Sequence, residues 1–120
     1  MESGAQLNIE AGTNIYAAFN NQTSFLSVQK GGKINATGTE QDPIFFTSIR
    51  KLTSVPSPGD WGGIIINGNA PINLAGGEGE GEGGTGIYGG NDPSDNSGVL
   101  RYVIIEYGGK NLGTDNELNG

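Results

Sequence analysis

The chain has 120 residues, enough for one small domain or for part of a larger one. Cysteine and histidine are both absent, which excludes disulfides, thiolate or imidazole metal sites, and catalysis by either side chain. Thirteen acidic residues against six basic ones give a net charge of −7. Nucleic acid is therefore not expected as a partner, because phosphate binding requires clustered Lys and Arg.

A similar pattern occurs twice near the N-terminus, at a spacing of 19 residues. Segments 7–12 and 26–31 share an apolar alternation that ends in glycine, and Ile15 corresponds to Ile34 in the same alignment. Period-two alternation that is broken by glycine is typical of short strands that end at corners. A unit that recurs at about 20 residues predicts a solenoid in which equivalent strands stack. We therefore expect Leu7 to stack on Leu26.

Further strand candidates follow along the chain, in segments 43–48, 61–68, 71–74, 99–109 and 118–120. Only 13–30 and 44–55 continue beyond ten residues without Gly or Pro, and neither carries the apolar spacing of a helix. We therefore predict an all-β fold. Nor does any window approach the roughly 20 apolar residues of a membrane span, so no transmembrane segment is expected.

Two segments are expected to lie outside the strands. Residues 50–60 form a polar stretch with two prolines, which predicts a turn that bulges from the coil. Residues 75–98 are low in complexity, acidic and rich in glycine, and only Ile87 and Tyr88 can pack there. We expect a mobile surface loop unless an ion or a partner orders it.

Four segments, 7–13, 31–48, 59–73 and 100–109, together resemble the right-handed parallel β-helix proteins found as surface lipoproteins and secreted proteins in the Bacteroidota. The resemblance implies a right-handed parallel β-helix of about four to five rungs. It also implies that residues 1–120 are one β-helix segment, the N-terminal portion of a longer protein. The implied location is extracellular or on the outer-membrane surface.

The alternation also predicts which side chains point into the coil. The expected inward residues are Leu7, Ile9, Ile15, Leu26, Val28, Ile34, Ile44, Phe46, Ile64, Ile66, Val103 and Ile105. The ends of a parallel coil expose unpaired N–H and C=O groups, which favour the addition of another strand. We therefore expect the C-terminal end to pair with a protein partner, a neighbouring copy or further β-helix rungs.

Parallel β-helices include polysaccharide lyases and hydrolases, so paired carboxylates are candidates for catalysis. Glycoside hydrolysis requires two carboxyl groups about 5–9.5 Å apart. Asp60 and Glu106, with Arg50, Lys51 and Arg101 as bases, are the candidates. Asp60 precedes a turn and Glu106 alternates outward on a strand, and nothing in the sequence pairs them. We therefore expect no enzymatic activity, with a fragment of a carbohydrate-active enzyme as the alternative.

Calcium is the only cofactor that the sequence suggests, and no other is expected. Asp92, Asp95 and Asn96 offer hard oxygens within one turn. Calcium takes six to eight such ligands, and the spacing does not match an EF-hand. An acidic, solvated turn is the more usual interpretation of such a segment.

Aromatic side chains offer faces on which sugars stack. Trp61 and Tyr107 are expected to cover corners and Tyr102 to lie in a stacked ladder, whereas Tyr88 lies in the glycine-rich loop. We take Trp61, Tyr88 and Asp60 as candidate ligand- or partner-binding residues. The sequence thus favours a non-catalytic cell-surface scaffold or binding module for a protein partner or a glycan.

Overall fold

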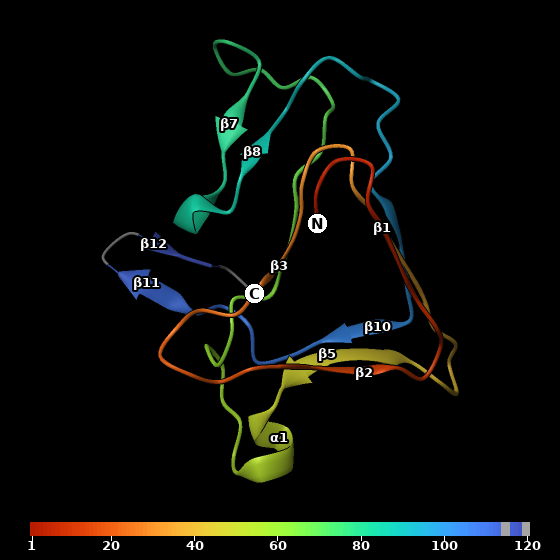
Figure 1. Ribbon diagram of the computed structural model, residues 1–120, viewed down its shortest axis with the longest axis vertical. Helices are drawn as coiled ribbons and strands as arrows, with labels where there is room; N and C mark the ends of the chain where they lie inside the picture. The colour runs from red at the N-terminus through yellow and green to blue at the C-terminus, as the bar shows by residue number, and fades with distance from the viewer. Residues whose placement is uncertain (114–115, 119–120) are drawn as a thin grey trace.

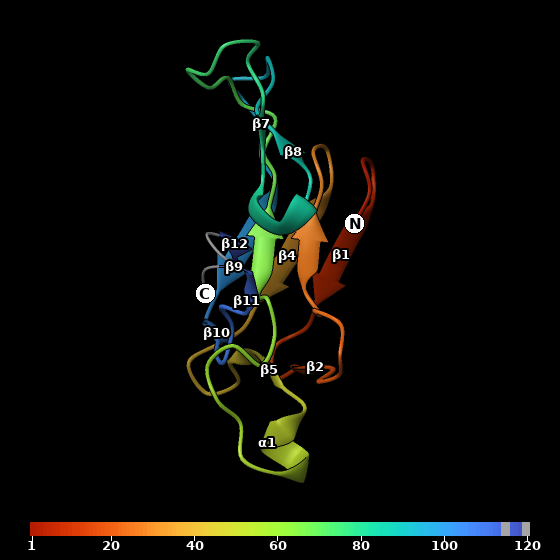
Figure 2. The same cartoon turned by 90° about the vertical axis from the view of Figure 1, so that its left-hand side faces the viewer.

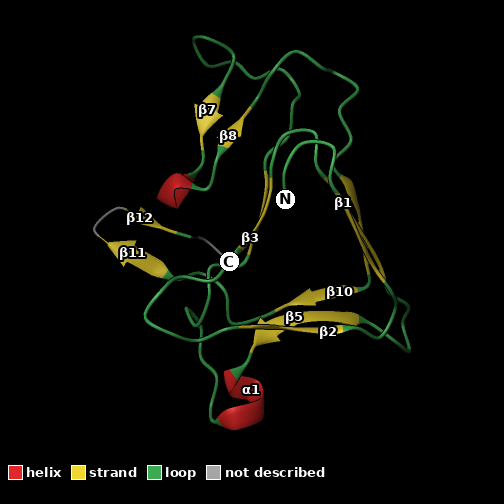
Figure 3. Ribbon diagram, viewed as in Figure 1, coloured by secondary structure: helices red, strands yellow, loops and turns green. Residues whose placement is uncertain are grey.

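The computed structural model describes residues 1–113 and 116–118, and short strands make up most of its regular structure (Figure 3). The only helical segments in this part of the chain are one α-helical turn and one 3-10 turn. The elements are β1 (Gln6–Ile9), β2 (Asn14–Ala17), β3 (Leu26–Val28), β4 (Lys33–Thr37), β5 (Ile44–Ser48), α1 (Arg50–Thr53), β6 (Ile64–Ile66), β7 (Gly79–Glu80), η1 (Glu82–Gly84), β8 (Ile87–Tyr88), β9 (Gly98–Arg101), β10 (Val103–Ile105), β11 (Asn111–Gly113) and β12 (Asn116–Glu117).

Eight strands form three parallel sheets that enclose a triangular space (Figure 1). The sheets have the orders β1-β4-β9, β2-β5-β10 and β3-β6. The chain passes along the three sides in turn, so each strand pairs with the strand that follows one circuit later. We call these circuits coil 1 (β1 to β3), coil 2 (β4 to β6) and coil 3 (β9 and β10).

The molecule is thin along the direction in which the coils stack. Its extents are 45 × 37 × 20 Å. Figure 2 shows this narrow side, with α1 and the β7–β8 hairpin extending at opposite ends of the long axis. No helix in residues 1–113 or 116–118 has the length and apolar character needed to cross a bilayer.

The register of the sheets shows that the predicted 19-residue repeat is wrong. Leu7 pairs with Ile34, 27 residues later, and Leu26 pairs with Ile64. The repeat had aligned β1 with β3, which lie on different sides of the same coil. Strands on all three sides of a coil bury alternate residues. The alternation is therefore the same for two strands that pair in one sheet and for two strands that follow each other within one coil. Residues 1–113 and 116–118 form two complete coils and part of a third, whereas four to five had been expected.

Insertions at the corners explain the irregular spacing. The connection from β2 to β3 spans 18–25, whereas the connection from β5 to β6 spans 49–63 and includes α1. The sequence correctly predicted that 50–60 lies outside the sheets but missed the helical turn. Within 75–98, the sequence also missed the antiparallel β7–β8 hairpin and η1.

The core lies inside the triangle and is built mainly by coil 2. Ten of the twelve side chains predicted to point inward belong to the core cluster or pack against it. Ile66 and Ile105, the last residues of the edge strands β6 and β10, do not, and they remain 41% and 45% exposed. The buried members are Val28, Ile34, Ala36, Ile44, Phe46 and Trp61.

Candidate functional site

The first cluster of charged side chains lies beside α1, where the corner of coil 2 folds back on itself. Arg50 Nη1 lies 3.0 Å from Asp60 Oδ1, and Asp60 is only 4% exposed. The Ser57 backbone N–H donates to Asp60 Oδ2 at 3.3 Å. Burial acts to raise the pKa of Asp60, but hydrogen bonds from Ser48 and Ser57 and the charge of Arg50 outweigh it, so the pKa is lowered.

The second carboxylate of this cluster follows β10. Glu106 Oε1 lies 2.6 Å from Lys51 Nζ and accepts a hydrogen bond from Thr47 Oγ1 at 2.8 Å. The hydrogen bond from Lys51 lowers the pKa of Glu106 despite its partial burial, and the same contact raises the pKa of Lys51. The pair therefore joins coil 3 to α1 in coil 2.

Both basic residues of α1 also lie over aromatic rings. Arg50 Cζ is 4.5 Å from the centre of the Phe19 ring, and Lys51 Nζ is 4.9 Å from that of Phe45. Cations over ring faces are attracted by the ring quadrupole. The helical turn is thus held against coils 1 and 2 by both its charges.

Trp61 and Asp60, two of the predicted binding residues, lie in the interior. Trp61 is 3% exposed and belongs to the core cluster. Its Nε1 donates to the backbone carbonyl of Glu106 at 2.8 Å. Little of either residue is therefore exposed to solvent, although Trp61 also lines a small apolar cavity of about 200 Å³ together with Leu26 and Phe46.

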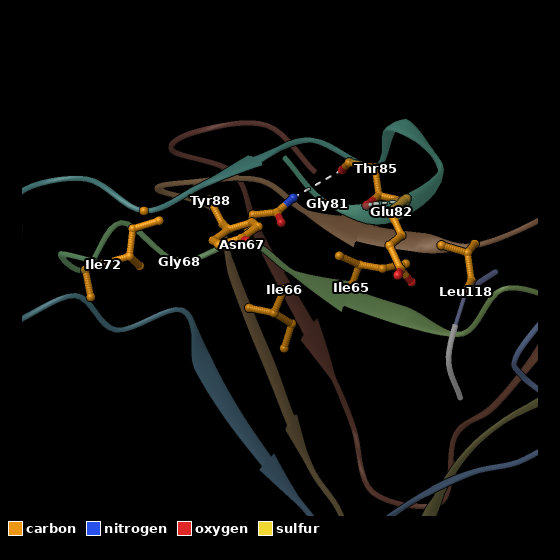
Figure 4. Close-up of a pocket in the computed structure, with 12 residues that line it drawn as sticks. Ile65, Ile66, Asn67, Gly68, Ile72, Gly81, Glu82, Thr85, Tyr88 and Leu118 are labelled. Atoms are coloured by element: carbon orange, nitrogen blue, oxygen red, sulfur yellow. Dashed lines mark hydrogen bonds between the residues drawn. The ribbon is translucent and has the colours of Figure 1, made fainter. Parts of the chain in front are cut away.

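Tyr88, the third predicted residue, lines a cavity of about 480 Å³ between β6 and the β7–β8 hairpin. Figure 4 shows its side chain on the hairpin side of the cavity, with Ile65 and Ile66 on the strand opposite. The wall is mostly apolar, and Asn67, Glu82 and Thr85 add polar groups. The other lining residues are Gly68, Ala70, Ile72, Gly81, Gly89 and Leu118.

A buried polar network holds the hairpin against the third sheet. The Thr85 carbonyl accepts hydrogen bonds from Ser27 Oγ at 2.9 Å, Gln29 Nε2 at 2.9 Å and Asn67 Nδ2 at 3.1 Å. Lys30 Nζ forms an ion pair with Glu78 and donates to a hairpin carbonyl. One wall of the cavity is therefore fixed by residues that are far apart in sequence.

Two glycines in the low-complexity segment permit this close packing. A Cβ on Gly79 would lie 2.6 Å from the Tyr88 ring, and a Cβ on Gly86, whose φ is +125°, would lie 2.2 Å from Gln29 Oε1. Glycine tolerates both the positive φ and the close approach. Their positions opposite Tyr88 and Gln29 depend on the folded chain, so composition alone did not reveal the hairpin.

The three side chains proposed for calcium each accept a backbone hydrogen bond, locally for Asp92 and Asn96 and from Asn69, 26 residues away in the sequence, for Asp95. The two local bonds are of the Asx-turn type, whereas the bond to Asp95 joins two separate loops. In the described part of the chain, no group of three or more acidic side chains is placed to hold a metal ion. The bonds are Ser94 N to Asp92 Oδ1 at 2.9 Å, Asn69 N to Asp95 Oδ2 at 3.0 Å and Gly98 N to Asn96 Oδ1 at 2.8 Å.

The parallel coils agree with a comparison against known protein families. A family model described as a pectate-lyase like beta helix domain matches residues 1–120. The chain belongs to this family. A search of curated proteins found no match, and a search of solved structures found none either.

In this pectate-lyase like domain, the structure brings together four of the five candidate catalytic residues. Asp60 is paired with Arg50 and Glu106 with Lys51, and both carboxyl pKa values are lowered. A general acid in glycoside hydrolysis needs a raised pKa instead. Arg101, the fifth candidate, lies apart at the end of β9. The cluster therefore has the character of structural ion pairs.

Proposed function

We propose that the chain is a non-catalytic β-helix module that binds a glycan in the cavity beside Tyr88. We further propose a right-handed solenoid located extracellularly or on the outer-membrane surface, as in the Bacteroidota lipoproteins and secreted proteins that it resembles. The proposal rests on the cavity itself, in which an aromatic ring faces a strand across about 480 Å³. Such concave, largely apolar sites with a few polar groups are typical of ligand-binding pockets.

Family membership and charge suggest what kind of glycan binds. The pectate-lyase like family makes a carbohydrate ligand the first choice over a protein partner. The net charge of −7 and the nearby acids Glu78, Glu80 and Glu82 disfavour a polyanionic sugar. We therefore propose a neutral or amino-substituted glycan, stacked on Tyr88.

The same family membership favours the second candidate function, a fragment of a carbohydrate-active enzyme. The ion pairs of Asp60 and Glu106 argue against it, because a carboxyl with a lowered pKa is a poor proton donor at neutral pH. Lys51, with its raised pKa, is likewise a poor general base. No calcium ion is required in the proposed binding function.

A glycan array followed by titration calorimetry tests the binding site. We expect neutral or amino-substituted glycans to bind and Tyr88→Ala to weaken binding about tenfold, from a lost stacking energy of about 1–1.5 kcal/mol. Tyr88→Phe keeps the ring and should retain binding. Tyr16→Ala, on the outward side of β2, is the matched control. Unchanged affinity in Tyr88→Ala, or no bound glycan, would contradict the proposal.

Reducing-end and lyase assays on the bound glycans separate the two functions. Binding without turnover supports the module. Turnover that is lost in Asp60→Asn or Arg101→Ala, with the fold intact by circular dichroism, supports the enzyme.

A further inference from the structure

Coil 1 and coil 3 both leave strand edges unpaired. β1 and β2 each pair on one side only, with β4 and β5, and β9 and β10 pair only with the same two strands on the other side. Since all these strands are parallel, the two ends of the stack present edges that run in the same direction. Unpaired parallel edges of this kind are templates for adding another strand.

The inward side chains at the two ends are complementary apolar groups. Leu100 and Ile105 are 40% and 45% exposed at the end of coil 3, although the register pairs them with the buried Ala36 and Phe46. At the coil 1 end, Ile9 and Ile15 are partly buried. At each end of the stack, these two apolar side chains therefore have no further coil to pack against.

The register shows which residues a second copy would supply. Leu100 follows Ala36 and Ile9 in one column, and Ile105 follows a column that contains Ile15. A second copy stacked in continuous register places its Ile9 on Leu100 and its Ile15 on Ile105. Both exposed apolar side chains are then covered, as their equivalents in coil 2 are.

Charge complementarity favours the same register. Glu10 follows Ile9 and Arg101 follows Leu100, so continued stacking places Glu10 of one copy beside Arg101 of the next. Both side chains are exposed, and neither forms an ion pair in residues 1–113 or 116–118. Opposite charges across an interface set register and direction more than affinity.

The N-terminal segment also fits the third side of such a stack. The Met1 amino group donates to the Ser27 carbonyl at 2.6 Å, and the Gln29 N–H donates to the Met1 carbonyl at 2.8 Å. Met1 therefore already occupies the free edge of β3. In a head-to-tail stack it lies between β3 of its own copy and β6 of the neighbouring copy, on the side where the described residues give coil 3 no parallel strand.

We propose that copies of this chain associate head to tail, with the β1–β2 edge of one copy on the β9–β10 edge of the next. The contact joins two different surfaces, so it does not close on itself and is expected to give linear chains of copies that grow with concentration. This proposal is independent of the glycan site, which lies beside the third sheet.

Charge reversal tests the pairing of the two ends. We expect Arg101→Glu, and separately Glu10→Lys, to shift the concentration for association about three- to tenfold upward in sedimentation velocity and light scattering. The double variant Glu10→Lys, Arg101→Glu should restore association. Glu40→Lys, an exposed acid in the corner between β4 and β5, is the matched control and should not shift it.

A second variant blocks the contact through its apolar part. Ile105→Asp is expected to fold, by circular dichroism, and to remain monomeric, because its carboxylate would be buried only in the stack. Electron microscopy of the wild type should show linear particles. A wild type that is monomeric at all concentrations, closed dimers, or association unaffected by charge reversal would each overturn the proposal.

Discussion

Coils 2 and 3 have the same inward alternation but very different burial. Ile34 and Ile44 of coil 2 are fully buried and Phe46 is 1% exposed, whereas Leu100 and Ile105 of coil 3 remain two-fifths exposed or more. In coil 2, β4 and β5 each have a neighbouring strand on both sides, whereas β9 and β10 of coil 3 have one on one side only. In a stacked fold, burial therefore depends on the neighbouring coil as well as on the residue itself.

The largest expected effect on stability comes from replacing an inward isoleucine by aspartate, compared between coil 2 and coil 3. Ile34→Asp should unfold the domain, because an unpaired carboxylate would be buried at a cost of several kcal/mol. Ile105→Asp, the matched change in coil 3, should lower the midpoint of urea unfolding far less, since its side chain reaches solvent. Circular dichroism at concentrations where the protein is monomeric measures both. Wild-type-like melting of Ile34→Asp would contradict the burial difference.

The ion pairs at α1 allow a second, smaller contrast. Arg50→Ala leaves Asp60 buried without its cation, and we expect a loss of about 1–3 kcal/mol in the free energy of unfolding. Lys51→Ala removes a more exposed pair and should cost less than about 1 kcal/mol. Urea titrations distinguish the two. Equal losses would show that the burial of Asp60 carries no special cost.

Local alternation was sufficient to predict which residues of a strand point inward, as Val28 and Phe46 show. It was insufficient to predict which strand lies beside which. Leu7 pairs with Ile34 and not with Leu26, because the corners between strands differ in length. Insertions such as 49–63 set the lengths of the corners. Apolar residues do not recur at regular intervals in them, so their lengths could not be predicted from the alternation.

The candidate site was predictable only where local sequence decides it. Ile87 and Tyr88 were predicted to be the only residues of the glycine-rich segment able to pack, and Tyr88 lines the cavity, while its role in binding stays a prediction. The burial of Trp61 and Asp60 depends on contacts with Glu106 and Arg50 that fold the corner back. Contacts between residues that are far apart in the sequence produce no recognisable sequence pattern, so they could not be predicted.

Acidification should weaken the ion pair of Asp60 within coil 2 and that of Glu106, which joins coils 2 and 3. The pKa values of Asp60 and Glu106 are lowered from their ordinary values of 3.8 and 4.5. Both groups therefore stabilise the fold above those ordinary values, and the stabilisation is lost as the pH falls through the lower folded-state pKa values. We expect the melting temperature to fall steadily below about pH 4.

Substitution of single acidic residues shows which carboxylate causes this loss of stability at low pH. Asp60→Asn should be less stable than the wild type at pH 7 and should show a flatter decline in melting temperature between pH 4 and pH 2. Glu40→Gln, which removes an exposed acid from the corner between β4 and β5, is the control. A decline in Asp60→Asn as steep as that of the wild type would show that Asp60 does not contribute to it.

The smallest expected effect is a gain in stability at the corner of coil 3. Tyr102 alone connects β9 to β10 and has a φ of +49°, whereas the corner of coil 1 contains Gly12 at +79°. A left-handed conformation costs a non-glycine residue about 1–2 kcal/mol. The Tyr102 side chain is 54% exposed, so little packing offsets that cost.

Tyr102→Gly should therefore raise the free energy of unfolding by a few tenths to about 1 kcal/mol, after the entropy cost of glycine is subtracted. The Tyr102 carbonyl accepts the Ile44 N–H at 2.9 Å, and glycine keeps this backbone bond. Tyr102→Asn should gain less, and Tyr16→Gly, within β2, should lose stability. If Tyr102→Gly and Tyr102→Asn both melt below the wild type, the tyrosine ring stabilises the open end of coil 3 more than its backbone strain weakens it.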